Sequence, residues 1–242
     1  MSEFLTGKRT LVTGASKGIG LAVARALRCA GARVVICARG SKALDQALAE
    51  LRKGDGGEVA GRTADVSNSD QVAQLFDFVD KQFGGLDILV NNAGIGVFRA
   101  TSELKIEEWN RVIETNLSGA FYCSREALER FQKSGAGGSI INISSLAGKN
   151  PFAGGAAYNA SKFGLNALSE AMMLDHRYDN VRVSYILPGS VDTAFSGHEV
   201  EQRSDWKIAP EDIAELVLQI LRMPERTLIS RIEVRPSQPR KN

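Results

Sequence analysis

A tyrosine and a lysine stand four residues apart in the segment Tyr-Asn-Ala-Ser-Lys, as Tyr158 and Lys162. Residues at this spacing share one face of a helix, so the lysine ammonium would lie one turn from the phenol. A phenol with its ordinary pKa of about 10 is a poor proton shuttle at neutral pH, and a nearby positive charge lowers that pKa. The pair therefore indicates proton transfer to or from a substrate oxygen, with Tyr158 as proton donor and acceptor.

A glycine-rich turn near the N-terminus indicates where a phosphate group would bind. The strand-like run Thr10 to Val12 is followed by Gly14, Gly18 and Gly20, and then directly by a helical pattern. Gly14 permits a sharp turn, Gly18 lets the backbone approach a pyrophosphate, and Gly20 allows close packing of helix on strand. Helix N–H groups would then face the anion. The spacing Gly-x3-Gly-x-Gly departs from the common G-x-G-x-x-G dinucleotide fingerprint.

The residue that follows the second strand-like run indicates which dinucleotide would bind. The run Arg33 to Cys37 leads into Ala38 and Arg39, with no acidic residue to bind a ribose 2′-hydroxyl. An arginine at this place can pair with a 2′-phosphate, and Lys17 in the glycine turn could approach the same group from the other side. The sequence therefore predicts NADP(H) as the cofactor.

Further motifs follow these in a fixed order along the chain. They are Asn91-Asn92-Ala93-Gly94, the segment Thr115 to Gly119 around Asn116, the pair Ser144-Ser145, Tyr-x3-Lys, and Pro188 to Thr193. Together with the glycine turn, this series resembles the short-chain dehydrogenase/reductase family from about Lys8 to Thr193. Tyr-x3-Lys alone is a weak motif, and it gains its meaning from the order of the whole series.

The resemblance implies a catalytic set of Asn116, Ser145, Tyr158 and Lys162. Ser145 would polarise or position the substrate carbonyl, and it precedes Tyr158 by thirteen residues, which is the family's usual interval. Ser144 is the competing candidate. Asn116 would hold a water in a proton relay to the lysine, or simply bond to backbone. Lys162 and a positively charged nicotinamide are expected to lower the pKa of Tyr158.

The resemblance also implies a set of cofactor-binding residues spread over five loops and the helix that carries Tyr158. Asp65 and Val66 would contact the adenine, while Val191 and Thr193 would lie near the carboxamide. The full set is Gly14, Ser16, Lys17, Gly18, Ile19, Gly20, Arg39, Asp65, Val66, Asn92, Ala93, Gly94, Tyr158, Lys162, Pro188, Gly189, Val191 and Thr193.

These motifs predict an NADP-dependent oxidoreductase that transfers a hydride between NADPH and a small carbonyl or alcohol. Within the family, the chain is most similar to the compact beta-ketoacyl carrier-protein reductases and related bacterial carbonyl reductases, which implies a 3-oxoacyl thioester or similar 3-oxo compound. A broad carbonyl reductase, a 3-hydroxy acid dehydrogenase and a non-catalytic NADPH sensor or scaffold are alternatives. The Asp-Gly-Gly ending of the ketoacyl reductases is absent from Leu228 to Pro236. Leu146, Phe98 and Phe152 are candidate apolar wall residues.

Short apolar runs alternate with segments of helical period, which is typical of a parallel sheet flanked by helices. The expected strands are Thr10 to Val12, Arg33 to Cys37, Val59 to Thr63, Ile88 to Val90, Ser139 to Ile143, Val181 to Ile186 and Leu228 to Val234. The expected helices are Gly18 to Ala30, Ser41 to Lys53, Ser69 to Phe83, Glu107 to Phe131, Tyr158 to Tyr178 and Pro210 to Leu221. Ser67, with Asp70 three residues later, resembles a capping box. We therefore expect a Rossmann-type, doubly wound α/β fold in a single domain spanning 1–242, with a short substrate lid at about 194–208.

Composition narrows the possible partners and sites. The 242 residues carry a formal charge of +2, which recommends neither nucleic acid nor a membrane surface as partner. Three scattered cysteines and two histidines argue against a disulfide framework and a metal site, and no Gly-x-Ser-x-Gly elbow supports a serine hydrolase. With no signal sequence or apolar span, we expect a cytoplasmic protein. The family resemblance implies a homodimer or homotetramer formed through the helices at Glu107 to Phe131 and Tyr158 to Tyr178.

Overall fold

The computed structural model describes residues 3–195 and 205–239. Seven parallel strands form one sheet in the order β3-β2-β1-β4-β5-β6-β7. The strands are β1 (Arg9–Thr13), β2 (Arg33–Ala38), β3 (Val59–Thr63), β4 (Ile88–Asn91), β5 (Gly138–Ile143), β6 (Val181–Pro188) and β7 (Arg231–Val234). The strand order reverses between β1 and β4, and this is the switch point at which open α/β sheets bind ligands.

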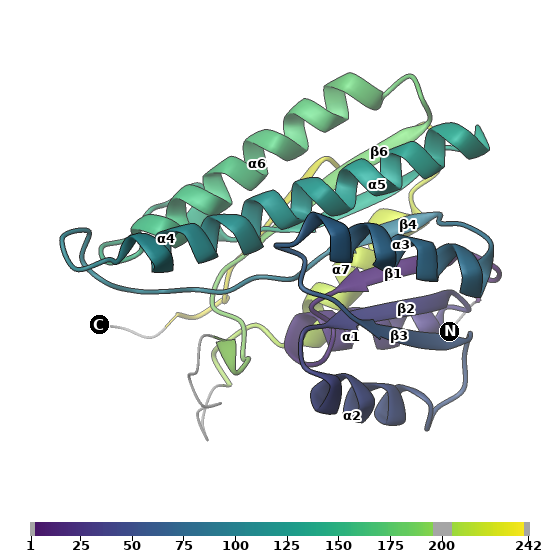
Figure 1. The fold of residues 1–242 in the computed structure, drawn as a ribbon, viewed down its shortest axis with the longest axis horizontal. Coiled ribbons are helices and arrows are strands. Elements are labelled where there is room, and N and C mark those ends of the chain that lie inside the picture. The colour runs from purple at the N-terminus through teal and green to yellow at the C-terminus, as the bar shows by residue number, and fades with distance from the viewer. Residues whose placement is uncertain (1–2, 196–204, 240–242) are drawn as a thin grey trace.

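Helices cover both faces of the sheet (Figure 1). On one face, α1 (Gly18–Cys29), α2 (Ser41–Leu51) and α7 (Pro210–Arg222) enclose one apolar core, and on the other α3 (Ser69–Phe83), α5 (Gly119–Ser134) and α6 (Ala156–His176) enclose a second. Successive strand residues face opposite cores, as Val34 and Val35 of β2 do. Burial of both faces explains why the strands are apolar runs rather than alternating patterns. The expected Rossmann-type fold is confirmed.

The expected single helix from Glu107 to Phe131 is wrong in its middle. The chain forms α4 (Ile106–Ile113), a π-helical turn at Glu114–Ser118, and then α5. The wider turn accompanies side-chain bonds from buried Asn116 to the backbone of Ile95, which an undisturbed α-helix pattern in the sequence does not reveal. π turns of this kind are frequent at functional sites.

Two smaller expectations at element ends are also corrected. The last strand begins at Arg231 rather than Leu228, because its register with β6 starts at the pair Tyr185 and Arg231. Helix α3 is capped by Asn68, whose side-chain oxygen accepts a 3.0 Å hydrogen bond from the Gln71 backbone N–H, so Ser67 is not the cap. Pro210 occupies the first turn of α7, as expected.

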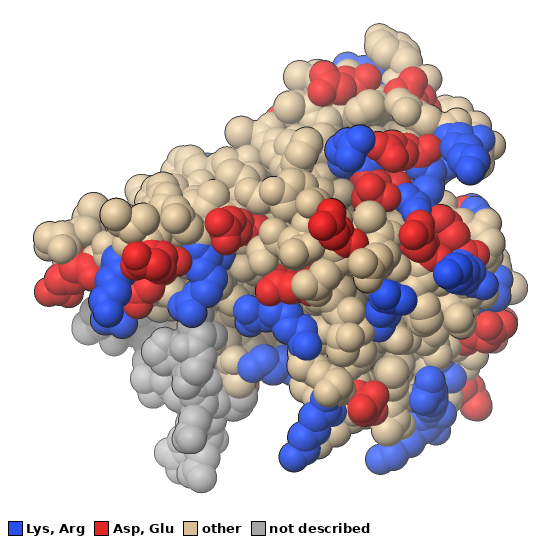
Figure 2. All heavy atoms as spheres, in the orientation of Figure 1, with Lys and Arg blue, Asp and Glu red and all other residues tan. Residues whose placement is uncertain are grey.

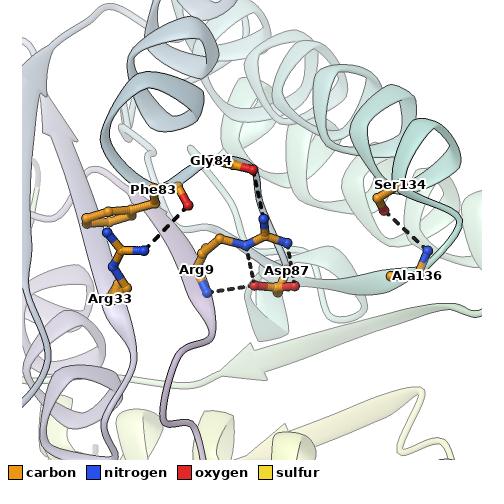
Figure 3. Close-up of polar contacts among 7 residues, drawn as sticks. All are labelled: Arg9, Arg33, Phe83, Gly84, Asp87, Ser134 and Ala136. Atoms are coloured by element: carbon orange, nitrogen blue, oxygen red, sulfur yellow. Dashed lines mark hydrogen bonds and ion pairs between the residues drawn. The ribbon is translucent and has the colours of Figure 1, made fainter.

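An ion pair fixes the amino ends of two central strands. Arg9 of β1 donates from Nε and Nη2 to the two oxygens of Asp87, at 2.8 and 2.9 Å, and from Nη1 to the Gly84 carbonyl (Figure 3). Burial opposes the charged carboxylate, but the hydrogen bonds and charge of Arg9 outweigh it and lower the pKa of Asp87. The bidentate pair aligns β1 with β4, whose opposite ends carry the glycine turn and the Asn91 to Gly94 motif.

Basic and acidic side chains are interspersed over the face drawn in Figure 2. No broad field of one sign dominates that face, in keeping with a formal charge of only +2. This face carries no broad basic patch of the kind that nucleic-acid-binding proteins present.

Candidate active site

A cleft of about 1300 Å³ runs along the carboxyl ends of the strands and crosses the switch point between β1 and β4. It exceeds the roughly 300–1,000 Å³ of ordinary small-molecule sites, so it has room for a dinucleotide and a second molecule. Of the predicted site residues, all but two line it. The exceptions are Gly20, buried beneath the turn, and Asn116, which is 1% exposed.

The glycine turn leaves no space for side chains. Gly14 has a φ of +63°, and a Cβ placed on it would lie 2.7 Å from the Ala93 Cα. The Asn92 side chain donates to the carbonyls of Thr13 and Gly14, both at 3.0 Å, so it fastens the turn to the segment that follows β4. The floor of this end of the cleft is therefore backbone, with the first N–H groups of α1 beside it.

The hydroxyl of Thr13 adds a second fastening that the sequence analysis missed. Its Oγ1 accepts hydrogen bonds from the backbone N–H groups of Asn92 and Ala93, at 3.0 and 3.1 Å. On the other side, a Cβ at Gly18 would lie 3.1 Å from the Thr193 Cγ2. Loops after β1, β4 and β6 thus meet around a cradle that only glycine keeps open. Such a cradle fits the pyrophosphate of a dinucleotide.

Arg39 and Lys17 both lie exposed on the wall of this cleft. The Lys17 ammonium donates a 3.1 Å hydrogen bond to the Ala194 carbonyl, at the start of the predicted lid. Asp65 also lines the cleft, but one of its carboxylate oxygens already accepts from the backbone N–H and hydroxyl of Ser67. Arg39 thus lies at the end of the cleft beside β2, where a 2′-phosphate could be bound, while the Lys17 ammonium is held at the lid segment.

Tyr158 and Ser145 meet in the same cleft. A hydrogen bond joins their hydroxyl groups, and Ser145 Oγ also accepts from the Ala147 backbone N–H at 3.1 Å. The competing Ser144 is buried, and its hydroxyl donates to the side chain of Asn166 on α6. Of the two serines, the geometry therefore favours Ser145 as the one that could hold a substrate oxygen beside Tyr158.

Lys162 lies on the same face of α6 as Tyr158, with its Nζ 5.8 Å from the centre of the tyrosine ring. It is buried and donates a 2.9 Å hydrogen bond to the Ile143 carbonyl. Burial lowers the pKa of Lys162 to about 8. Burial also raises the pKa of Tyr158, and the opposing effect of the Ser145 hydrogen bond is smaller. Among the chain's own groups, desolvation of the phenolate outweighs the stabilising contacts. The expected depression of the tyrosine pKa also invoked the charge of a bound nicotinamide, so it stays a prediction for the enzyme with its cofactor.

Asn116 lies behind the cleft, and its side chain is held from two sides. Its Oδ1 accepts from the Ile95 N–H at 2.8 Å, and its Nδ2 donates to the Ile95 carbonyl at 2.9 Å and to Ser161 Oγ at 3.0 Å. Gly94 leaves a space between it and Lys162, since a Cβ there would be 3.4 Å from Asn116 Oδ1 and 3.8 Å from Lys162 Nζ. Ser161 was overlooked, although it stands inside the Tyr-x3-Lys motif.

The predicted lid is described only at its two ends, because 196–204, including His198, lies outside the described residues. The ends are bound together by hydrogen bonds from Asp192 N to the Ile208 carbonyl and from Ile208 N to the Ser190 carbonyl, at 2.9 and 3.0 Å. The Phe195 ring packs on Tyr158, with ring centroids 5.7 Å apart. No motif in the sequence marked Phe195.

Membrane-spanning helices and metal-binding clusters are absent from the described residues. None of the helices described there is long and apolar enough to cross a membrane. Within the same part of the chain, no group of three His, Cys, Asp or Glu side chains is placed to hold a metal ion.

Comparisons with known proteins give one consistent result. The family model described as short chain dehydrogenase matches residues 8–204. The 3beta-hydroxysteroid dehydrogenase 1 of Eggerthella lenta is 37% identical over 225 residues, which cover 88% of this chain and 86% of the relative. An alcohol dehydrogenase structure from Thermococcus sibiricus, complexed with 5-hydroxy-NADP, is 31% identical with a TM-score of 0.89, covering 97% of this chain and 99% of its own. A variant of actinorhodin polyketide ketoreductase with NADPH is 32% identical with a TM-score of 0.88, covering 98% of each chain.

Proposed function

The chain belongs to the short-chain dehydrogenase family, and from this premise we propose that it is an NADP-dependent oxidoreductase that interconverts a small carbonyl compound and its alcohol. The observation that carries the proposal is the pair of hydroxyls on Ser145 and Tyr158, joined by a hydrogen bond in the cleft that also contains the glycine turn. Proton transfer and dinucleotide binding could therefore occur side by side in one cleft.

The cofactor-binding residues follow from the cradle and the charges around it. The backbone of the glycine turn would bind the pyrophosphate, and Arg39 and Lys17 would pair with a 2′-phosphate. Lys17 would exchange its bond to the Ala194 carbonyl for this contact. Similar structures that contain NADP, NADPH or 5-hydroxy-NADP support the same preference. When bound, the nicotinamide supplies or receives the hydride at the substrate carbon.

The chain's own residues would move the proton. In reduction, Ser145 holds the carbonyl oxygen and Tyr158 donates its phenolic proton to that oxygen as the C–H bond forms. The raised pKa of Tyr158 keeps the phenol protonated at neutral pH, which suits this direction. Lys162, with its pKa lowered to about 8, is poised to return a proton to the phenolate. The space beside Gly94, between Asn116 and Lys162, could hold a water that resupplies the lysine. In oxidation each transfer runs in reverse.

The proposed function implies a small ketone or secondary alcohol as substrate. A polyketide ketoreductase among the similar structures supports 3-oxo compounds, and a hydroxysteroid dehydrogenase among the relatives supports alcohols on ring systems. A broad carbonyl reductase or a 3-hydroxy acid dehydrogenase would use the same proton-transfer residues. These substrates differ in charge and shape, so the walls of the carbonyl end must distinguish them.

Self-association through α5 and α6 is part of the same proposal. Three large apolar side chains on these helices are exposed, namely Phe121, Phe163 and Leu174. Exposed apolar residues gathered on neighbouring helices are typical of an interface. Light scattering should give a dimer or tetramer, and a monomer at micromolar concentration would contradict this part of the proposal. The cytoplasmic location stays a prediction of the sequence.

A paired binding and turnover assay tests the proposed activity. Protein fluorescence is titrated with NADPH and with NADH, and NADPH consumption is then followed with 3-oxoacyl thioesters, 3-oxo acids and cyclic ketones. We expect tighter binding of NADPH and turnover of at least one ketone. Tighter binding of NADH would overturn the roles of Lys17 and Arg39. Binding of NADPH without turnover of any compound would favour the alternative of a non-catalytic sensor.

A further inference from the structure

Three phenylalanine rings surround the hydroxyl-bearing ring of Tyr158. Phe98 follows β4, Phe152 follows β5 and Phe195 follows β6, so each comes from a different loop. Their ring centroids lie 5.7, 6.5 and 5.7 Å from that of Tyr158, and Phe98 and Phe152 are 5.7 Å apart. These separations lie within the range in which aromatic rings attract one another. We call Phe98, Phe152 and Phe195 the aromatic box.

The aromatic box is open toward the cleft. All three rings line the cleft, yet Phe98 remains 41% exposed and Phe152 44% exposed. Large apolar side chains that only completed a core would be covered on all sides. Because these rings pack on one another and still present free surface beside Tyr158, they form a wall against which an apolar molecule could bind.

The two loops that carry Phe98 and Phe152 are fastened to each other. The Arg99 backbone N–H donates to the Gly154 carbonyl at 2.7 Å, and the Asn159 side chain donates to the Phe152 carbonyl at 2.9 Å. A Cβ at Gly155 would lie 2.6 Å from the edge of the Phe152 ring, so this ring rests directly on the glycine backbone. The rings are therefore held in place before any substrate arrives.

The same wall lacks a group that would neutralise a charged substrate. No charged side chain lines the cleft from the loop after β4, at 92–98, or from the loop after β5, at 144–152, and all of these residues are described. Arg99 is paired with Glu108 at 3.1 Å and Lys149 with Glu233 at 2.6 Å, and neither lines the cleft. Elsewhere along the cleft the lining charges include Arg111 of α4 and, from the lid side, Lys207, Asp192 and Glu211. These two cations and two anions balance, so this part of the lining does not favour a carboxylate.

We infer that the preferred substrate carries its carbonyl on a flat, uncharged ring system, as a cyclic or aryl-fused ketone, with the corresponding secondary alcohol as product. This inference rests on the proposed function and narrows its substrate class. A flat ring would stack against the aromatic box while its oxygen reaches Ser145 and Tyr158. A flexible aliphatic chain would lose more conformational freedom for the same contact, and a 3-oxo acid would leave its carboxylate without a partner.

Paired ketones and leucine variants test the inference. We would measure kcat/KM with 2-tetralone, with 2-decanone, which matches it in carbon count, and with acetoacetate. The wild type should prefer 2-tetralone to 2-decanone by about tenfold or more, and acetoacetate should be poorest. Each of Phe98→Leu, Phe152→Leu and Phe195→Leu should lower kcat/KM for 2-tetralone by about three- to tenfold, mainly through KM, and hardly change that for 2-decanone. Phe78→Leu, on α3 outside the cleft, is the matched control and should leave the ratio unchanged.

The possible outcomes distinguish a failure of the ring preference from a failure of the proposed oxidoreductase activity. Equal or faster turnover of 2-decanone or acetoacetate, or an equal loss with all ketones in the box variants, would overturn the ring preference while leaving a carbonyl reductase. Binding of 2-tetralone to the enzyme with NADP, measured by calorimetry in parallel with turnover, decides the case in which no ketone is reduced. If 2-tetralone binds, the box variants weaken that binding and no ketone is reduced, the proposed function fails and ring recognition stands. If 2-tetralone neither binds nor reacts, the inference is overturned.

Discussion

The two ends of the cleft differ in whether the backbone or the side chains provide the contacts. At the phosphate end, contacts come from the backbone around Gly14 and Gly18, where an added Cβ would meet Ala93 or Thr193. At the carbonyl end, contacts come from side chains, namely the hydroxyls of Ser145 and Tyr158 and the aromatic box. Backbone geometry tolerates no substitution but binds a group common to all dinucleotides. Side chains on loops can change without altering the sheet, so they are where one member of the family differs from another.

The two ends also differ in how they treat charge. Arg39 and Lys17 at the phosphate end are exposed and keep their hydration, so their charges cost little. At the carbonyl end Lys162 is buried, and its pKa is lowered to about 8 by desolvation. The chemistry thus requires an unfavourable burial that anion binding does not, as is common where function and stability compete.

Removal of the Tyr158 hydroxyl should have the largest effect and should be confined to the carbonyl end. Tyr158→Phe deletes the proton donor but keeps the ring that packs on Phe98 and Phe195. We expect kcat to fall by about 10³-fold, with the affinity for NADPH nearly unchanged. Turnover and fluorescence titration measure the two quantities. Unchanged turnover would refute the role of Tyr158 and remove the distinction between the two ends.

A methyl group at Gly14 should damage the phosphate end instead. Gly14→Ala introduces a Cβ at 2.7 Å from the Ala93 Cα in a residue whose φ is +63°. The backbone must shift, and we expect NADPH affinity to fall by about 10- to 100-fold, as judged by fluorescence titration. Gly135→Ala is the control, because Gly135 has a φ of +66° but open space around it. If both variants bind NADPH equally well, the cradle is not the phosphate site.

Replacement of Lys162 should expose the cost of the buried charge. Lys162→Met should lower turnover less than Tyr158→Phe does, yet stabilise the protein at neutral pH by about 1–3 kcal/mol, measured by urea unfolding. The unfolded lysine titrates at 10.5 and the folded one at about 8, so the unfolded state binds more protons between these values. Wild-type stability should therefore rise with pH in this window, and the advantage of the methionine should shrink. A variant less stable than the wild type at neutral pH would show that the Ile143 bond outweighs desolvation.

Loss of Arg39 should have the smallest effect of the four, because this residue is exposed and its charge is screened. Arg39→Ala should weaken NADPH binding by about tenfold and leave NADH binding unchanged. Arg62→Ala on β3, where Arg62 stacks on Phe78 outside the cleft, should change neither affinity. An equal loss for both dinucleotides in Arg39→Ala would mean that this arginine does not distinguish them.

The glycine turn could be predicted from the sequence because its backbone geometry excludes other residues. A turn with positive φ at Gly14 and no room for a Cβ can be filled only by glycine, so the motif is visible in the chain. The sheet could be predicted equally well, because strands buried on both faces must be apolar runs. The expected strand ends therefore lay close to those found, with β7 as the main exception.

The carbonyl end was harder to predict from the sequence, because its residues are distant in sequence and of common types. Phe98, Phe152 and Phe195 lie on three separate loops, and nothing in their local sequences distinguishes a cleft wall from a core residue. The π turn at Asn116 was missed because the apolar spacing on either side continues a normal helix. The raised pKa of Tyr158 depends on how deeply the ring is buried, which spacing alone does not show.

At the carbonyl end of the cleft, one substrate carbonyl group is proposed to receive a hydride from NADPH on its carbon and a proton from Tyr158 on its oxygen. The most direct test uses NADPH deuterated at the nicotinamide carbon that donates the hydride, with 2-tetralone and an acyclic ketone as acceptors. We predict deuterium on the carbinol carbon of the product alcohol with the wild type, detected by mass spectrometry, and almost none with Tyr158→Phe. Bound NADPH that never transfers deuterium to any ketone, or equal transfer by Tyr158→Phe, would contradict this prediction.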